Sequence, residues 1–205
     1  MIRRTLMFGT LALTLAAGTA FAQDTVKIGL ILPMTGPFAS TGRQIEAAAK
    51  LYMQQKGDTV AGKKIQLIVK DDTGTADVTK RLAQELIVND KIAVMAGFGL
   101  TPLALASAPL ATQAKVPQVV MAAATSTITE ASPFIVRTSF TLPQATVPMA
   151  DWAAQNGIKK VATLVSDYGP GIDAEKAFTA AFTAKVSGLV RRQRWSITKT
   201  HERRR

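Results

Sequence analysis

The sequence predicts an α/β fold, a parallel sheet with helices on both faces. Short apolar runs, typical of buried strands, alternate with longer stretches whose apolar residues recur at helical spacing. Turn residues, mostly glycine and proline, separate these segments. Because parallel strands have to be joined by crossovers, usually helical ones, this alternation is typical of repeated β–α–β units.

The first strand and the first helix show the pattern most clearly. Residues 26–31 form an apolar run that ends near Pro33, as expected of a buried strand. Residues 41–55 then carry apolar side chains at helical spacing, and Gly57 follows as a helix terminator. The same reasoning predicts, in order, a strand at 64–70, a helix at 77–88 with Asp77 as its N-cap, a strand at 92–96, a helix at 103–113, and strands at 116–122 and 134–137.

The alternation is interrupted once and then resumes. Residues 139–145 fit neither a strand nor a regular helix, so we interpret them as a hinge crossing. The segment 23–138 is then a first lobe that is nearly whole, and 146–184 is the beginning of a second lobe. Around and beyond the crossing we expect a helix at 144–155, a strand at 160–166 and a helix at 172–184.

The N-terminus has the three parts of a secretory signal peptide. Arg3 and Arg4 precede an uncharged stretch rich in leucine and alanine, and Ala20 and Ala22 supply the small residues of a cleavage site. The apolar stretch is too short to span a bilayer. We therefore assign 1–22 to a signal peptide that directs the chain to the periplasm. The chain contains no cysteine, which excludes disulfides and thiol chemistry.

Positive charge is concentrated at the C-terminus. The formal net charge is +11, but residues 185–205 alone hold eight lysines and arginines against one glutamate. The body before this tail is close to neutral, so it lacks the basic face that nucleic-acid binding requires. The tail has neither helical periodicity nor a strand followed by a helix. We expect it to be disordered, or to be the product of a truncation or frame shift.

No arrangement of residues supports an enzyme. The single histidine, His201, lies in the tail, so a catalytic triad has no credible general base. Nucleophile-elbow, zinc-binding and phosphate-loop motifs are all missing, and we expect neither a metal nor a cofactor. Asp71 and Asp72 are adjacent. Because neighbouring residues of a strand point to opposite faces, a structural role is favoured over paired acid–base chemistry.

Binding is better supported, because four loops rich in small and hydroxylated residues follow predicted strands. In a parallel sheet, ligands bind beyond the carboxyl ends of the strands, where loops present backbone N–H groups and helix N-termini. Small residues let the backbone approach a ligand, and a hydroxyl group beside a helix N-terminus suits a carboxylate. These loops are 33–42, 97–102, 122–127 and 166–169.

Four segments carry a resemblance to a known family: 26–37, Asp71–Asp72, 123–126 and 166–171. Together they resemble the branched-chain amino-acid-binding proteins, of the leucine/isoleucine/valine-binding type. These are the type I periplasmic solute-binding proteins of ABC importers. The resemblance implies two Rossmann-like lobes that close on a small ligand, here an amino acid or a related small carboxylate. It also implies a monomer that delivers this ligand to a membrane permease.

The same resemblance implies a set of ligand-binding residues. Thr101 and the backbone near Leu100 would hold the ligand's carboxylate. Ala123 and Thr125 would take its carboxylate or its amino group, and Tyr168 would close over it from the second lobe.

Thr41 completes the predicted set and bears on specificity. It stands where leucine/isoleucine/valine binders tend to have an aromatic contact, which argues against a branched aliphatic ligand. The second lobe is only begun, so we expect ligand binding to be impaired. A micromolar site is worth about −8 kcal/mol, and losing half of that leaves roughly millimolar binding.

Two other functions stay open. The basic tail, with Trp195 among arginines, could bind an anionic membrane surface. Alternatively, the same fold could serve as the ligand-binding domain of a receptor or sensor.

Overall fold

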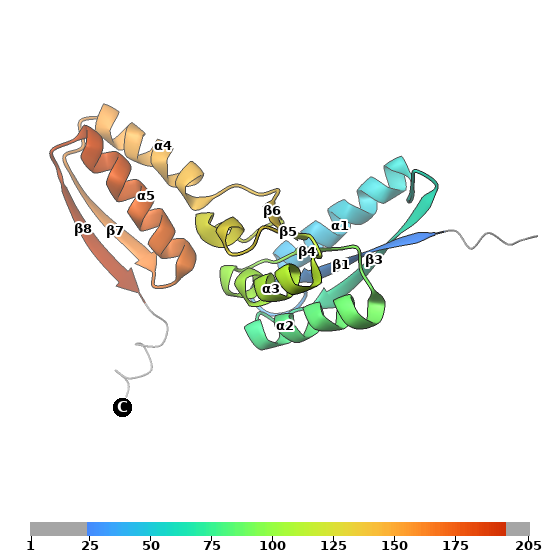
Figure 1. Cartoon of the computed structure of the whole chain (residues 1–205). Coiled ribbons are helices and arrows are strands. Elements are labelled where there is room, and N and C mark those ends of the chain that lie inside the picture. The colour runs from blue at the N-terminus through green and yellow to red at the C-terminus, as the bar shows by residue number, and fades with distance from the viewer. Residues whose placement is uncertain (1–23, 196–205) are drawn as a thin grey trace, which may run out of the picture.

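Six strands build one sheet in the N-terminal part of the chain. The computed structural model describes residues 24–195, and Figure 1 shows them as two α/β units. We call residues 24–138 the N-terminal unit. Its strands have the order β2-β3-β1-β4-β5-β6, and all neighbours are parallel except the β2–β3 hairpin. They are β1 Thr25–Leu32, β2 Thr59–Val60, β3 Lys63–Asp71, β4 Val94–Gly97, β5 Gln118–Val120 and β6 Ile135–Arg137.

Helices cover both faces of this sheet, as predicted. Helix α1 (Ala39–Lys56) lies on one side, and α2 (Ala76–Glu85) and α3 (Thr101–Ala114) lie on the other (Figure 1). A π-helical turn, Leu86–Asp90, continues α2, and a 3₁₀ helix, Ser126–Glu130, follows β5. The crossovers therefore place three helices around the sheet, and the carboxyl ends of its parallel strands lie along one edge.

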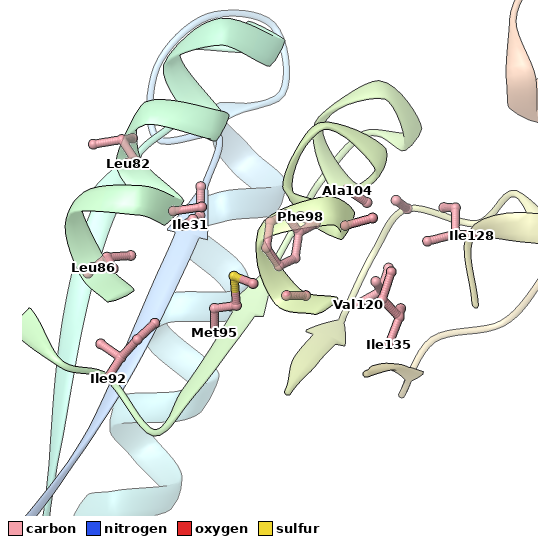
Figure 2. Packing of buried hydrophobic residues seen from close by; sticks show 14 residues of the cluster. Ile31, Leu82, Leu86, Ile92, Met95, Phe98, Ala104, Val120, Ile128 and Ile135 are labelled. Atoms are coloured by element: carbon pink, nitrogen blue, oxygen red, sulfur yellow. The ribbon is translucent and has the colours of Figure 1, made fainter. Parts of the chain in front are cut away.

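The larger part of the core lies under α2 and α3. Figure 2 shows Phe98, which is fully buried, in the middle of this cluster. Its other labelled members are Ile31, Leu82, Leu86, Ile92, Met95, Ala104, Val120, Ile128 and Ile135. On the opposite face, Leu30 and Leu32 pack against the apolar side of α1. Alternate residues in the second half of β1 thus face the two clusters, which is why residues 28–32 contain no polar side chain.

Gly97, at the end of β4, lies close against the backbone of β1. Its φ is +115°, and an added Cβ would lie 2.2 Å from the carbonyl oxygen of Ile31. Only glycine fits, because that approach leaves no room for a side chain. The loop that leads into α3 begins at this close approach of the Gly97 and Ile31 backbones.

The second unit consists of residues 142–195, which we call the C-terminal unit. Helices α4 (Leu142–Gln155) and α5 (Gly169–Lys185) pack on one face of two parallel strands, β7 (Lys160–Ser166) and β8 (Leu189–Trp195). Phe182 is fully buried there and stacks on Phe178. The other face of the sheet is open, and Leu164 is 73% exposed on it.

The strand β8 corrects the expectation of disorder from residue 185 onward. Residues 189–195 pair in register with all of β7. The fully buried Glu175 carboxylate accepts a hydrogen bond from Arg194 Nε at 2.9 Å and forms an ion pair with Arg194 Nη2 at 2.8 Å. Disorder is therefore the wrong prediction for this stretch, because tertiary pairing and a buried ion pair override its charge pattern. The last ten residues, 196–205, lie outside the described part of the chain.

The predicted element boundaries shift by a few residues. Helix α3 begins at Thr101 and α4 at Leu142, each two residues before the prediction. The N-cap of α2 is Thr75 rather than Asp77. The predicted signal peptide, 1–22, lies outside the described residues.

None of the helices between residues 24 and 195 is long and apolar enough to cross a membrane.

Candidate ligand site

Two threonines from neighbouring loops form the centre of the candidate site. Thr101 follows β4 and Thr125 follows β5, and their Oγ1 atoms are 2.7 Å apart. Both side chains are buried, and either hydroxyl can be the donor. Within residues 24–195, no acceptor is found for the N–H groups of Thr101 and Thr125. The pair therefore offers hydroxyl and N–H groups at the carboxyl edge of the sheet, as the loop pattern predicted.

The N-termini of two helices meet at this pair. Thr101 is the first residue of α3 and Gly169 the first residue of α5. A Cβ added to Gly169 would lie 3.2 Å from Thr101 Cγ2 and 3.3 Å from Thr125 Oγ1. Neither helix has a side-chain cap in the described structure. Since helix N-termini carry partial positive charge, both favour an anion at this point.

Arg137 holds the loop that carries Thr125. Its guanidinium, at the end of β6, donates hydrogen bonds to the carbonyl oxygens of Ala123 and Thr125. Burial lowers the pKa of Arg137, and the negative charge of Asp173 opposes that shift. The loop is therefore clamped at two carbonyl groups by one side chain.

Asp173 reaches the same loop from the C-terminal unit. Its carboxylate accepts hydrogen bonds from the Ser126 N–H and from Ser126 Oγ, both at 2.8 Å. The Leu142 N–H, where α4 begins, donates to the carbonyl oxygen of Ala124 at 2.9 Å. Both helices of the C-terminal unit thus contact the 123–126 loop.

Three other predicted residues lie around the threonine pair. Leu100 is the N-cap of α3, and Tyr168, which is 40% exposed, is the N-cap of α5. Ala123 is buried, but its N–H donates to the Phe98 carbonyl and its carbonyl accepts from Arg137. Its N–H is therefore not free for a carboxylate, whereas its carbonyl keeps a second lone pair.

Thr41 lies in the first turn of α1. It lines a groove of about 620 Å³ on the α1 side of the sheet. Apolar groups of α1, together with Met121 and Phe140, form most of that groove. Five of the six predicted residues therefore lie on the loops around the threonine pair, and Thr41 faces a separate groove.

The adjacent aspartates have structural roles. Asp71 accepts hydrogen bonds from the N–H groups of Met34 and Thr73 and from Thr35 Oγ1. Burial raises its pKa, but these hydrogen bonds outweigh burial and hold the pKa below the usual value. Asp72 is fully buried, accepts from the Gly74 N–H, and has its pKa raised by burial. The structure thus supports the structural interpretation of both.

The sequence did not single out Arg137 or Asp173, and it indicated Ser126 only as part of the 122–127 loop. An arginine at a strand end and an aspartate early in a helix are common at surfaces, so their patterns carry no signal for a shared contact. Within the described residues, no cluster of histidine, cysteine or carboxylate side chains could hold a metal. The arrangement is a polar cradle suited to a small anion.

The structure thus combines an α/β fold with polar loops at the carboxyl edge of its parallel sheet, which is where such folds bind ligands. The chain belongs to the periplasmic binding protein family, whose profile matches residues 25–200. This match confirms the family that the sequence resembles and its type I fold. The family and the neighbours described below bind solutes and are not enzymes, in agreement with the prediction.

Three known proteins illustrate the similarity. Leu/Ile/Val-binding protein homolog 6 of Brucella abortus (strain 2308) is 48% identical over 172 residues, which are 83% of this chain and 44% of that protein. The solute-binding protein of an ABC transporter from Rhodopseudomonas palustris BisB5, solved with 3,4-dihydroxybenzoic acid, is 65% identical, with a TM-score of 0.80 over 84% of this chain and 47% of that one. An R. palustris solute-binding protein solved with 4-hydroxybenzoate is 48% identical, with a TM-score of 0.81 and coverage of 84% and 47%.

The chain thus spans about half the length of each of these three proteins.

Proposed function

We propose that this chain acts as the solute-binding component of an ABC importer and that its solute is a small hydroxylated aromatic carboxylate. The observation that carries the proposal is the 65% identity to a protein solved with 3,4-dihydroxybenzoic acid. Family membership supports the binding role and a location outside the cytoplasm, in the periplasm. The partner would be the membrane permease of the importer, with the binding component working as a monomer.

The geometry of the threonine pair supports a carboxylate ligand. The hydroxyl groups of Thr101 and Thr125 and the free N–H groups beside them would receive the carboxylate oxygens. The N-termini of α3 and α5 would stabilise its charge. Tyr168, the N-cap of α5 next to Gly169, would contact the aromatic ring.

A branched-chain amino acid is the second candidate, favoured by the name of the Brucella relative. The two ligand classes share the carboxylate and differ in the rest of the molecule. An amino acid needs an acceptor for its ammonium group, for which the free lone pair of the Ala123 carbonyl is available. An aromatic acid needs a ring-sized apolar space instead.

Calorimetric titration with 3,4-dihydroxybenzoate, 4-hydroxybenzoate and leucine tests the proposal. We expect the two benzoates to bind more tightly than leucine. We expect absolute affinities weaker than micromolar, because a site that closes with half of its contacts loses several kcal/mol of binding energy. Leucine binding tenfold tighter than either benzoate would reject the aromatic ligand while leaving the binding role intact. If none of the three compounds bound, both the aromatic ligand and the binding role would be rejected.

A further inference from the structure

Asp173 makes a bidentate contact between the two units. Its two carboxylate oxygens accept from two donors of one residue, Ser126 N–H and Ser126 Oγ, each at 2.8 Å. The partners are 47 residues apart in the sequence and belong to different units. Two hydrogen bonds to one carboxylate fix orientation as well as distance.

The contact lies beside the threonine pair. Gly169 and Asp173 are four residues apart in α5, so they lie on the same face of the helix. Gly169 approaches Thr101 and Thr125, while Asp173 binds Ser126. The first turn of α5 therefore rests along the loop that follows β5.

Arg137, from the N-terminal unit, also holds that loop. It binds the carbonyl groups on either side of Ala124, and its charge attracts Asp173. If the two units separated, the loop would keep Arg137 but lose Asp173. The geometry of residues 123–126 then depends on whether the units are together.

We propose that Asp173 latches the C-terminal unit onto the 123–126 loop, so that ligand binding between Thr101, Thr125 and α5 and closure of the two units are coupled through Ser126. This inference rests on the proposed binding function for its ligand part. Asp173 acts through Ser126 and is a positioning residue, not a ligand contact. A ligand that contacts both units binds the latched state more tightly and shifts the population toward it.

The latch can be tested without a ligand, because the chain has no native cysteine. Spin labels at Lys80→Cys in α2 and Lys159→Cys before β7 would report the distance between the units, and both side chains are exposed. Asp173→Asn keeps the shape of the side chain and removes its charge. The matched control is Asp151→Asn, since Asp151 lies in the same unit and pairs only with Lys185 in that unit among the described contacts.

We expect Asp173→Asn to broaden the distance distribution toward longer distances and Asp151→Asn to leave it unchanged. A distribution for Asp173→Asn that matches wild type overturns the latch. Ser126→Ala removes one of the two donors, so it should produce a smaller broadening than Asp173→Asn. Circular dichroism melts establish that each variant is folded.

Binding of 3,4-dihydroxybenzoate provides the second measurement. We expect Asp173→Asn to raise the Kd by about tenfold, as for loss of a charge-assisted hydrogen bond, and Asp151→Asn to change it less than about twofold. A lower Kd for Asp173→Asn would overturn the latch and indicate that Asp173 competes with the ligand's carboxylate. If wild type binds no benzoate, the proposed ligand fails, and the spin-label distances still decide whether the latch exists.

Discussion

The N-terminal unit and the C-terminal unit use the same β–α alternation but bury it to different extents. In the N-terminal unit, helices cover both faces of six strands, and two separate clusters of buried side chains fill the space. In the C-terminal unit, helices cover one face of two strands, and the single cluster found among its described residues is centred on Phe182. Leu164 and Trp152 remain 73% and 61% exposed.

This difference shows that the local sequence pattern and the stability of a unit have different physical origins. Periodicity alone places most of the strands and helices in both units, because it depends only on neighbouring residues. The free energy of folding depends on how much apolar surface is removed from water, which a two-stranded sheet covered on one face provides poorly. We therefore expect the N-terminal unit to be the more stable, with the C-terminal unit stabilised in part by its contact with the 123–126 loop.

The largest effect is expected from truncating buried phenylalanines. Phe98→Ala should lower the free energy of unfolding of the N-terminal unit by about 3–5 kcal/mol, because it leaves a cavity in the centre of the main cluster. Phe182→Ala, also fully buried, should act on the C-terminal unit alone. Amide hydrogen exchange resolves the two units. If Phe182→Ala accelerated amide exchange in β1 and β4 as much as in the strands of the C-terminal unit, the two units would unfold together.

The next largest effect concerns buried hydroxyl groups. Thr101→Val should cost about 1–3 kcal/mol in urea unfolding, because the Thr125 hydroxyl loses its partner in a buried place. Thr163→Val is the matched change in the C-terminal unit, where a 3.3 Å bond to Glu175 is lost but Glu175 keeps Arg194. We expect a loss below about 1 kcal/mol there. A larger loss of unfolding free energy from Thr163→Val than from Thr101→Val would contradict this order of the two effects.

Acid should affect the N-terminal unit through Asp71. Its folded pKa lies below the usual value, so it contributes stability that is fully present above about pH 4 and is lost as the pH falls through the folded pKa. Asp71→Asn removes this contribution, and its melting temperature should fall less steeply below about pH 4 than that of wild type. Parallel melting curves for the two proteins over that range would contradict the assignment.

The smallest change in stability is expected on the open face of the C-terminal unit. Leu164→Lys should alter the free energy of unfolding by no more than about 0.5 kcal/mol, since the side chain is 73% exposed. The same change should reduce self-association in sedimentation velocity, because an exposed apolar strand face favours it. A loss of several kcal/mol would mean that this face is covered in solution.

Much of the fold follows from local patterns. The strand at 160–166 has the predicted bounds, and every other predicted strand and helix is present with ends displaced by a few residues. The hairpin β2–β3 was not predicted, since a strand as short as Thr59–Val60 has no periodicity to detect. Likewise, β8 carries arginines in a pattern that resembles a disordered tail, and only its pairing with β7 makes it a strand.

The candidate site, like the fold, has features that the sequence predicted and features that it could not predict. The loop pattern singled out residues 97–102, 122–127 and 166–169, because the carboxyl ends of parallel strands share an edge. Within these loops, the family resemblance implied Leu100, Thr101, Thr125 and Tyr168. Sequence patterns could not show that the Ala123 N–H is already bound by the Phe98 carbonyl. They also could not place Thr41 on the α1 groove, since that depends on which side of the sheet α1 packs.

The sequence by itself thus determined the parallel α/β alternation, the family and the edge of the sheet where a ligand would bind. Those features depend on spacing within one segment or on a motif within one loop. The tertiary structure alone decided that Asp173 meets Ser126 and that Arg137 binds two carbonyl groups. Such contacts join residues far apart in the chain, and a single charged residue has no local pattern that specifies its partner.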